Sequence, residues 1–405
     1  MEYLEMNVKK NVFILSLCQT FFTSTTSVLA LTAGLIGYQL IKFNQAYATI
    51  PISAMVIGTA ISTAPVAKIM NAKGKKTAFI VGNFIAIFGS LVCLYAIYFK
   101  LFWFFVFGVF LIGCFSAFAH QYRFAAADIS DEKFKPKAIS LVLAGGVFAA
   151  YFGPEIASRT SGFFDSYLYL GSYCVILLIL LLSLIATNLI NLPKVKNIKT
   201  QEESRKLKII IKQPLFILSV ASSTIGFSVM ILIMTATPIA MIEHCGHKLN
   251  DAKLVIQWHV IAMFAPSFFT GNLINFFGTL KVIGVGVLLM FVAISIAILG
   301  TDLIHFWLSM FFLGLGWNFM FVGGSTLLTS TYLPNETSKA QGFHDSIVFY
   351  SVAISSIGSG VLLEFFGWSG IGFGAVPLML LMVLIFFFVL LLKFGEGNFS
   401  NKMKT

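Results

Sequence analysis

The chain has 405 residues, of which 58% are hydrophobic and 11% are charged, and its formal net charge is +11. A soluble domain carries roughly 25% charged residues, so this composition excludes an ordinary soluble protein and indicates a polytopic membrane protein. The basic residues lie in short gaps between apolar runs rather than on one face, which argues against a nucleic-acid partner and for a role in membrane topology.

The apolar runs predict an all-α membrane protein with twelve transmembrane helices. Each run is long enough to cross a bilayer, which takes roughly 20 residues. The runs are also too long and continuous for the alternating strands of a membrane β-barrel. In chain order, we expect helices over residues 11–37, 47–69, 77–98, 101–127, 138–160, 167–190, 215–241, 252–276, 280–300, 304–330, 341–363 and 370–394.

One polar linker, "LPKVKNIKTQEESRKLKIIIKQP", divides these helices into two sets of six. We therefore expect an N-terminal six-helix bundle at residues 1–190, a cytoplasmic linker at 191–213 and a C-terminal six-helix bundle at 214–405. With the N-terminus in the cytoplasm, only Lys42, Lys100, Arg159, Lys248 and Lys253 fall in external segments. The positive-inside rule then predicts that both termini are cytoplasmic in a multi-pass protein of the inner membrane.

The loops after the second and eighth predicted helices repeat a pattern. "AKIMNAKGKK" and "GNLINFFGTL" each have asparagine at the fifth position and glycine at the eighth, Asn71 and Gly74 in one and Asn275 and Gly278 in the other. A transporter built from two related halves predicts such a correspondence. On these features the chain resembles the major facilitator superfamily, which implies two six-helix bundles related by pseudo-two-fold symmetry.

In that family the same loop locks the two halves through charge pairs. Gly74, Lys75 and Lys76 match the end of the family motif, but Asn71 replaces its acid. The resemblance therefore implies a weakened or rerouted lock. Asp128 is an acid that can pair with Lys75 or Lys76 in its place.

Two further strings bear on the kind of transporter. "GGVFAAYFGPEIASRTSG" resembles a glycine-rich antiporter stretch at Gly153 and Pro154, but alanine or serine stands at three of the expected glycines, so import and export both stay open. "QYRFAAAD" and "VIQWHVIAMFAPSFFTG" are similar to a bacterial subgroup of the family near which riboflavin carriers lie.

Polar and aromatic residues inside the predicted helices are the candidate substrate ligands. They are Gln19, Thr23, Thr26, Arg123, Trp258, His259, Trp317 and Asn318. Structural alternatives remain for several of them, because helix hydroxyls often bond their own backbone and a lone histidine often serves packing. Arg123 lies about 33 Å down the fourth helix. It either snorkels to the cytoplasmic interface, pairing with Asp128 or lipid phosphate, or binds an anionic or carbonyl group of the substrate.

Charged residues within helices are the candidate coupling or gating groups. Glu155 and Arg159 are spaced to pair on one face of the fifth helix. His344 and Asp345 open the eleventh helix and form either an interfacial charge lock or a proton relay. The full set is Glu155, Arg159, Asp128, His344, Asp345, Gly74, Lys75 and Lys76.

These features predict a secondary active transporter of a small organic solute that works by alternating access and is proton-coupled, with a vitamin such as riboflavin as a possible solute. The alternatives are an exporter of drugs, siderophore or metabolite by proton antiport, and a non-transporting membrane sensor. No catalytic set is present, and the five cysteines show no ligand spacing, so we expect no enzyme activity, cofactor or metal. The expected partners are the solute, protons and the lipid bilayer, without nucleic acid, and the protein is expected to be a monomer.

Overall fold

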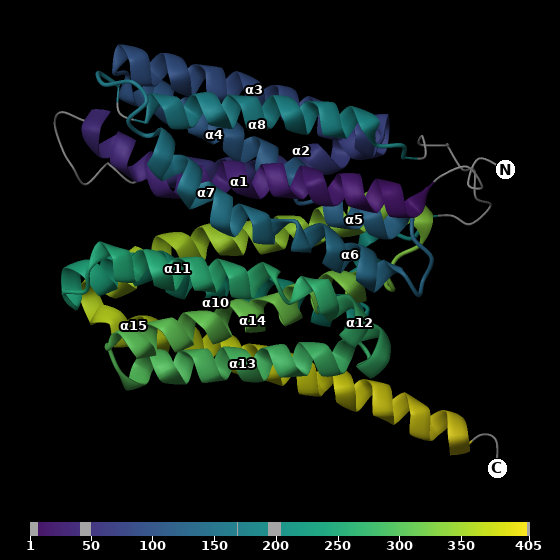
Figure 1. Ribbon diagram of the computed structural model, residues 1–405. Helices are drawn as coiled ribbons and strands as arrows, with labels where there is room; N and C mark the ends of the chain where they lie inside the picture. Colours follow the sequence, from purple (N-terminus) through teal and green to yellow (C-terminus); the bar gives the residue numbers. More distant parts are fainter. Residues whose placement is uncertain (1–6, 41–49, 168, 193–203, 403–405) are drawn as a thin grey trace. The chain divides into compact units, whose positions relative to one another are not determined.

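The computed structural model describes residues 7–40, 50–167, 169–192 and 204–402, and the regular structure in these ranges is helical (Figure 1). Contacts divide the chain into two compact units. The first comprises Met1–Ile198 with Ser267–Gly271, and the second comprises Lys199–Pro266 with Asn272–Thr405. Residues 193–203 of the expected linker, and the expected external residue Lys42, lie outside the described residues.

The helices of the first unit follow the six expected spans, with two of the spans interrupted. The spans expected at 101–127 and 138–160 were predicted as continuous helices, and each is instead a pair of shorter helices. The described helices are α1 (Val8–Leu40), α2 (Ile50–Lys73), α3 (Lys75–Phe99), α4 (Phe102–Ala119), α5 (Tyr122–Asp128), α6 (Lys135–Ala144), α7 (Gly146–Thr160) and α8 (Leu170–Leu189).

The second unit differs from expectation at two places. The span expected at 252–276 is broken at Pro266, and the last two expected spans form one helical run divided at Gly367, whose φ is 66°. Among the described residues, eleven helical segments are long and apolar enough to cross a membrane. The helices are α9 (Leu207–Ile210), α10 (Pro214–Ile239), which continues as a π-helical turn (Ala240–His244), α11 (Leu249–Phe264), α12 (Ser267–Phe277), α13 (Thr279–Leu299), α14 (Leu303–Leu328) and α15 (Thr337–Lys402).

Each helix break in the membrane leaves backbone groups that need new partners, because lipid offers none. At the α6–α7 break, Thr20 of α1 donates to the Gly145 carbonyl at 2.8 Å, and Ser16 donates to the Leu141 carbonyl at 2.9 Å. A side chain at Gly145 would begin 2.3 Å from the Ser16 carbonyl, so only glycine permits this approach. Hydroxyls of α1 therefore join α1 to the broken helix.

The two loops that repeat in the sequence also repeat in structure. Gly74 separates α2 from α3 with φ 84°, and Gly278 separates α12 from α13 with φ 89°. Each glycine N–H donates to the carbonyl four residues earlier, that of Met70 or Ile274, at 2.9 Å. Both positions need a left-handed backbone, which residues with a Cβ adopt at a cost.

Helix packing within each unit follows the same order. In the first unit α1 packs on α7, α2 and α3 pack on α4, and α3 packs on α8. In the second unit α10 packs on α15, α11 and α13 pack on α14, and α13 packs on the later part of α15 through Gly372. Each unit is thus assembled from the same sequence of helix pairs.

We predict that Gly278→Ala destabilises the protein because alanine must adopt a positive φ at this turn. The expected loss is about 1–2 kcal/mol of unfolding free energy. The control is Gly358→Ala, since Gly358 lies within α15 with no atom within 4 Å of an added Cβ. Alanine is the better helix former, so this control should be neutral or stabilising. Thermal unfolding in detergent measures both, and equal midpoints for the two variants would contradict the prediction.

Candidate functional site

Five aromatic rings from four helices of the second unit form one cluster, which we call the Trp317 cluster. Its rings belong to Phe227 (α10), Phe264 (α11), Trp317 and Phe321 (α14) and Phe349 (α15). Trp317 and Phe321 stack with centroids 4.9 Å apart and planes 14° apart. Phe227 meets both rings edge-on at 5.4 Å. Such offset and edge-on pairs are the favoured arrangements of aromatic rings.

The Trp317 cluster combines apolar faces with one polar donor. Trp317 is 2% exposed, and its Nε1 has no hydrogen-bond partner among the described residues. A buried indole N–H without a partner is uncommon because its desolvation is costly. Phe227 is only half-buried, so its ring is the member that a solute can reach. Trp317 was predicted from the sequence as a ligand, but the four phenylalanines around it were not.

His259 and Asn318 both join α11 to α14, and Asn318 directly follows Trp317 in the chain. The buried His259 ring has Nδ1 2.7 Å from the Met310 carbonyl oxygen, which can only accept. In the neutral ring Nδ1 therefore carries the proton, and Nε2 is an acceptor that has no partner among the described residues. Asn318 donates to the Met263 carbonyl at 2.7 Å, at the turn before Pro266.

Trp258 does not join this cluster. Its side chain is 41% exposed and meets Trp307 edge-on at 5.8 Å. Trp307 in turn stacks on Phe311, so these rings form a separate aromatic surface. Trp258 and His259 were both predicted as ligands because they are adjacent in the sequence. Their side chains differ, since Trp258 is exposed and His259 is buried.

The three predicted ligands on α1 make hydrogen bonds with one another or with their own helix. Gln19 and Thr23 are buried, and the Gln19 amide donates to the Thr23 hydroxyl at 3.1 Å. Thr26 donates back to the Thr23 carbonyl at 3.1 Å, as the packing alternative expects. Gln19 and Thr23 therefore contact each other through their side chains, whereas Thr26 contacts only the backbone in these hydrogen bonds.

Arg123 is buried on the short helix α5. Its guanidinium donates to the His120 carbonyl at 2.8 Å and lies 4.4 Å from the centre of the Phe124 ring. The side chain is 1% exposed, so the guanidinium lies among protein atoms. Its role as an interfacial or a substrate-binding cation stays a prediction. His120 follows the last residue of α4, and a cation beside the carbonyls of a helix C-terminus is favourable.

Asp128 pairs with Lys75. The Lys75 ammonium lies 2.5 Å from the Asp128 carboxylate, which confirms the expectation that Asp128 supplies the acid absent at Asn71. Lys76 donates to the Asn188 carbonyl at 2.8 Å, near the C-terminus of α8. The lysines of this loop therefore hold α5 and α8 to the start of α3 within the first unit.

The other two predicted charge pairs differ in burial. Arg159 donates to Glu155 at 2.6 Å, which confirms the predicted pairing, and the Glu155 side chain is 30% exposed. His344 lies with Nδ1 2.8 Å from the Asp345 carboxylate, and both side chains are buried. A charge change at His344 or Asp345 is therefore more costly than one at Glu155.

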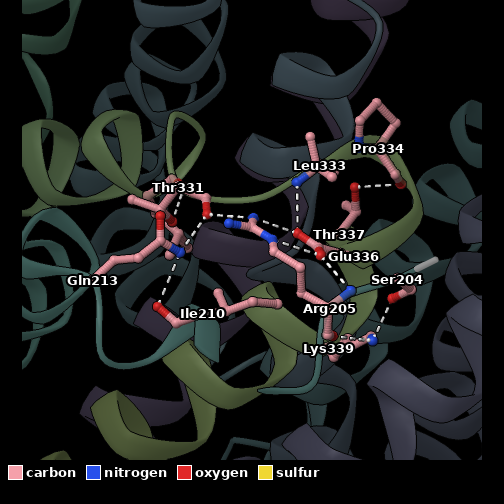
Figure 2. Close-up of polar contacts among 11 residues, drawn as sticks. Ser204, Arg205, Ile210, Gln213, Thr331, Leu333, Pro334, Glu336, Thr337 and Lys339 are labelled. Atoms are coloured by element: carbon pink, nitrogen blue, oxygen red, sulfur yellow. Dashed lines mark hydrogen bonds and ion pairs between the residues drawn. The ribbon is translucent and has the colours of Figure 1, made fainter. Parts of the chain in front are cut away.

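An ion pair that the sequence reasoning missed holds the start of the second unit (Figure 2). Glu336 lies in the turn before α15, and both of its carboxylate oxygens accept two hydrogen bonds. Arg205 supplies three of the donors, from its backbone N, Nε and Nη2, and the Leu333 N–H supplies the fourth. These bonds are 2.6–2.9 Å long, and Glu336 is 0% exposed.

Neighbouring side chains extend this network. Arg205 also donates to the Thr331 carbonyl at 3.1 Å, and Gln213 donates to the same oxygen at 2.9 Å (Figure 2). Lys339 donates to the Arg205 carbonyl at 2.9 Å. The hydrogen bond with Glu336 raises the pKa of Arg205 above its ordinary value. The sequence has arginine only at positions 123, 159 and 205, so Arg205 could have been noticed, but its partner lies 131 residues away.

Comparison with known proteins places the chain in a family. A model of the Major Facilitator Superfamily matches residues 12–265 and 224–402. The chain belongs to this superfamily, and it is a multi-pass membrane transporter rather than an enzyme.

Two transporters with similar sequences align with nearly the whole chain. The chain is 36% identical to the riboflavin transporter RfnT of Brucella anthropi over 377 residues, which cover 93% of this chain and 94% of the relative. It is 26% identical to the uncharacterized MFS-type transporter YdeG of Bacillus subtilis, over 93% of this chain and 91% of the relative.

Solved structures share the fold. The human organic anion transporter MFSD10 matches with a TM-score of 0.76 at 10% identity, covering 94% of this chain and 100% of that chain. The fucose:proton symporter FucP of E. coli matches with a TM-score of 0.72 at 17% identity, covering 93% and 97%. At these identities the likeness concerns the fold alone.

We predict that Glu336→Gln destabilises the protein far more than Glu155→Gln. Both glutamates pair with an arginine at 2.6 Å, but Glu336 is fully buried and accepts four hydrogen bonds. Glutamine at 336 turns an NH₂ group toward donors, for an expected loss of about 2–3 kcal/mol. The screened Glu155 pair should cost less than about 1 kcal/mol. Unfolding in detergent measures both, and similar losses would show that burial does not govern these pairs.

Proposed function

We propose that this protein carries riboflavin, or a closely similar planar heteroaromatic solute, across the cytoplasmic membrane by alternating access. The observation that carries the proposal is the Trp317 cluster, in which stacked rings lie beside an indole donor without a protein partner. The likeness to a riboflavin transporter over nearly the whole chain supports the same solute class.

The chemistry of a flavin matches what this part of the second unit offers. A flavin is flat and apolar on its faces, and its edge carries both carbonyl acceptors and an N–H donor. Aromatic side chains stack on such faces, and a few placed polar groups then set the orientation. Trp317 Nε1 is a donor for a carbonyl of the solute, and His259 Nε2 is an acceptor for its N–H.

The other predicted ligands contribute differently to this proposal. On the first unit, Gln19 and Thr23 are proposed contacts for hydroxyl groups of the solute, and Arg123 is a proposed buried cation for a polar oxygen. Thr26 is a weaker candidate because its hydroxyl donates to its own helix. In the second unit the proposed role of Asn318 is to hold α11 through its hydrogen bond to the Met263 carbonyl, not to contact the solute directly. Trp258 is the weakest of the proposed ligands because it lies outside the Trp317 cluster.

The proposal includes a proton gradient as the energy source, uptake as the direction, and a monomer with both termini in the cytoplasm. The placement of the termini rests on the concentration of lysine in the segments on one side of the predicted membrane. Two charge pairs are candidates for the coupling proton, Glu155 with Arg159 on α7 and His344 with Asp345 on α15. Ionisable residues within membrane helices are frequent proton carriers.

We predict that Phe227→Leu and Trp317→Phe each weaken riboflavin uptake. Loss of the half-buried ring, or of the indole donor, should raise the KM for uptake about tenfold, which corresponds to about 1.4 kcal/mol of binding. The matched control is Trp368→Phe, because Trp368 is also buried with an unpartnered Nε1 but packs on Phe306 outside the cluster. Labelled riboflavin uptake in a riboflavin-requiring strain, with membrane expression confirmed, measures all three.

Two results would contradict the proposal. Uptake equal to that of empty vector, with the protein present in the membrane, would exclude riboflavin as the solute. Equal KM values for Trp317→Phe and Trp368→Phe, alongside working uptake, would leave the solute but remove the Trp317 cluster as its binding site.

We predict that Glu155→Gln abolishes accumulation driven by a pH gradient but preserves solute exchange in proteoliposomes. Exchange needs only the movement of loaded carrier, whereas accumulation needs the proton-carrying group. The comparison variant is Asp345→Asn, which alters the buried pair on α15. If Glu155→Gln accumulates solute with unchanged pH dependence while Asp345→Asn does not, Glu155 is only the structural partner of Arg159.

A further inference from the structure

The segment that precedes the first membrane span of the second unit is held in place from both of its ends. Arg205 before α9 and Gln213 after it both donate to the Thr331 carbonyl, at 3.1 Å and 2.9 Å (Figure 2). Between them Ile210 is 0% exposed, and α9 packs on α15. Residues 205–213, which we call the α9 segment, are therefore a fixed part of the second unit.

The α9 segment presents three lysines on its exposed side. Lys206, Lys208 and Lys212 are all exposed. Lys208 and Lys212 are four residues apart, the spacing that places two side chains on one face of a helical turn. Within residues 204–213 and 331–339 the sequence has one acid, Glu336, and four hydrogen-bond donors already surround its carboxylate. The α9 segment is thus a positively charged surface with a fixed backbone.

An apolar side chain lies among these lysines. Ile209 is 53% exposed and stands three residues before Lys212, on the same side of the turn. Lys212 in turn lies two residues before the span that begins at Pro214, so this surface is at the edge of the membrane. The boundary between lipid headgroups and acyl chains accommodates both ammonium groups and an apolar side chain, whereas bulk water accommodates only the former.

We propose that the α9 segment is a docking surface for an anionic phospholipid. The ammonium groups of Lys206, Lys208 and Lys212 bind the headgroup phosphate, and Ile209 contacts the upper part of the acyl chains. Lysine binds phosphate as a compact point charge, and basic groups near an anionic leaflet are attracted to it. Arg205 is not part of this surface, because Glu336 already neutralises its charge.

The position of the surface favours a lipid over a soluble anion. A soluble phosphate would use the lysines but gain nothing from Ile209. The α9 segment also lies on the predicted cytoplasmic side, where anionic lipids give the membrane surface a negative potential. The proposal concerns the lipid around the second unit and does not depend on which solute the protein carries.

Thermal unfolding with two lipids tests the proposal. The purified protein in a neutral detergent receives either phosphatidylglycerol or phosphatidylcholine with the same acyl chains. We expect the anionic lipid to raise the unfolding midpoint of the wild type by about 2–4 °C more than the zwitterionic lipid. The triple variant Lys206→Gln/Lys208→Gln/Lys212→Gln should lose this difference. Added salt should also reduce the difference in the wild type, because it screens exposed charges.

The matched control removes the same charge from other exposed lysines. It is the triple variant Lys68→Gln/Lys73→Gln/Lys281→Gln, whose three positions lie on α2 and α13. We expect this control to keep the wild-type difference between the two lipids. Ile209→Ser keeps every lysine and should lose part of the difference, because the acyl-chain contact is removed.

Native mass spectrometry provides a readout that does not depend on stability. The wild type should retain more bound phosphatidylglycerol than the α9 triple variant, and equal retention would overturn the proposal. An equal lipid difference in the wild type and the α9 triple variant would do the same, as would its loss in the control. Equal stabilisation by glycerol phosphate without lipid would show that the surface binds a soluble anion instead.

Discussion

The absence of hydrogen-bonding solvent inside a bilayer is the constraint on which the rest of this structure depends. A transmembrane helix satisfies its own backbone, so any interruption must be repaired by neighbouring side chains. The α6–α7 break is repaired by Ser16 and Thr20 of α1, and the α4–α5 break is covered by Arg123 at the His120 carbonyl. Some of the polar residues in the membrane helices therefore form hydrogen bonds that hold the broken helices together.

The same constraint separates structural polar groups from available ones. Thr26 bonds its own helix and Asn318 bonds the Met263 carbonyl, whereas Trp317 Nε1 and His259 Nε2 have no protein partner among the described residues. In a medium without water, an unpaired buried donor or acceptor is costly enough to require an explanation. Those two atoms are therefore better evidence for a solute contact than a count of polar residues along a helix.

The fold and the family were predictable from sequence because they depend on repeated, local signals. The length of each apolar run gave the number of spans, and the glycines at 74 and 278 marked two turns with the same backbone conformation. The helix break at Gly145 was not predictable, because hydropathy does not change there and the break coincides with a close approach of Ser16 from another helix. The break at His120 was also missed, although the Arg123 contact on its carbonyl is local. Local pairs such as Glu155 with Arg159 follow from spacing, but Arg205 and Glu336 meet only through the tertiary fold.

Each of the two units contains an ion pair, but the two pairs lie at different places and differ in burial. In the first unit the family acid is replaced by Asn71, and Lys75 finds its carboxylate on Asp128 of α5 instead. In the second unit the matching loop has Asn275 and a single lysine nearby, and the strong ion pair lies elsewhere, between Arg205 and Glu336.

The Lys75 pair is partly exposed and contributes little to stability, so it can break and re-form during a transport cycle. The Arg205 pair encloses a buried carboxylate with four donors, so breaking it would leave an uncompensated charge. The first pair therefore suits a contact that changes, and the second suits one that holds the start of the second unit through every state.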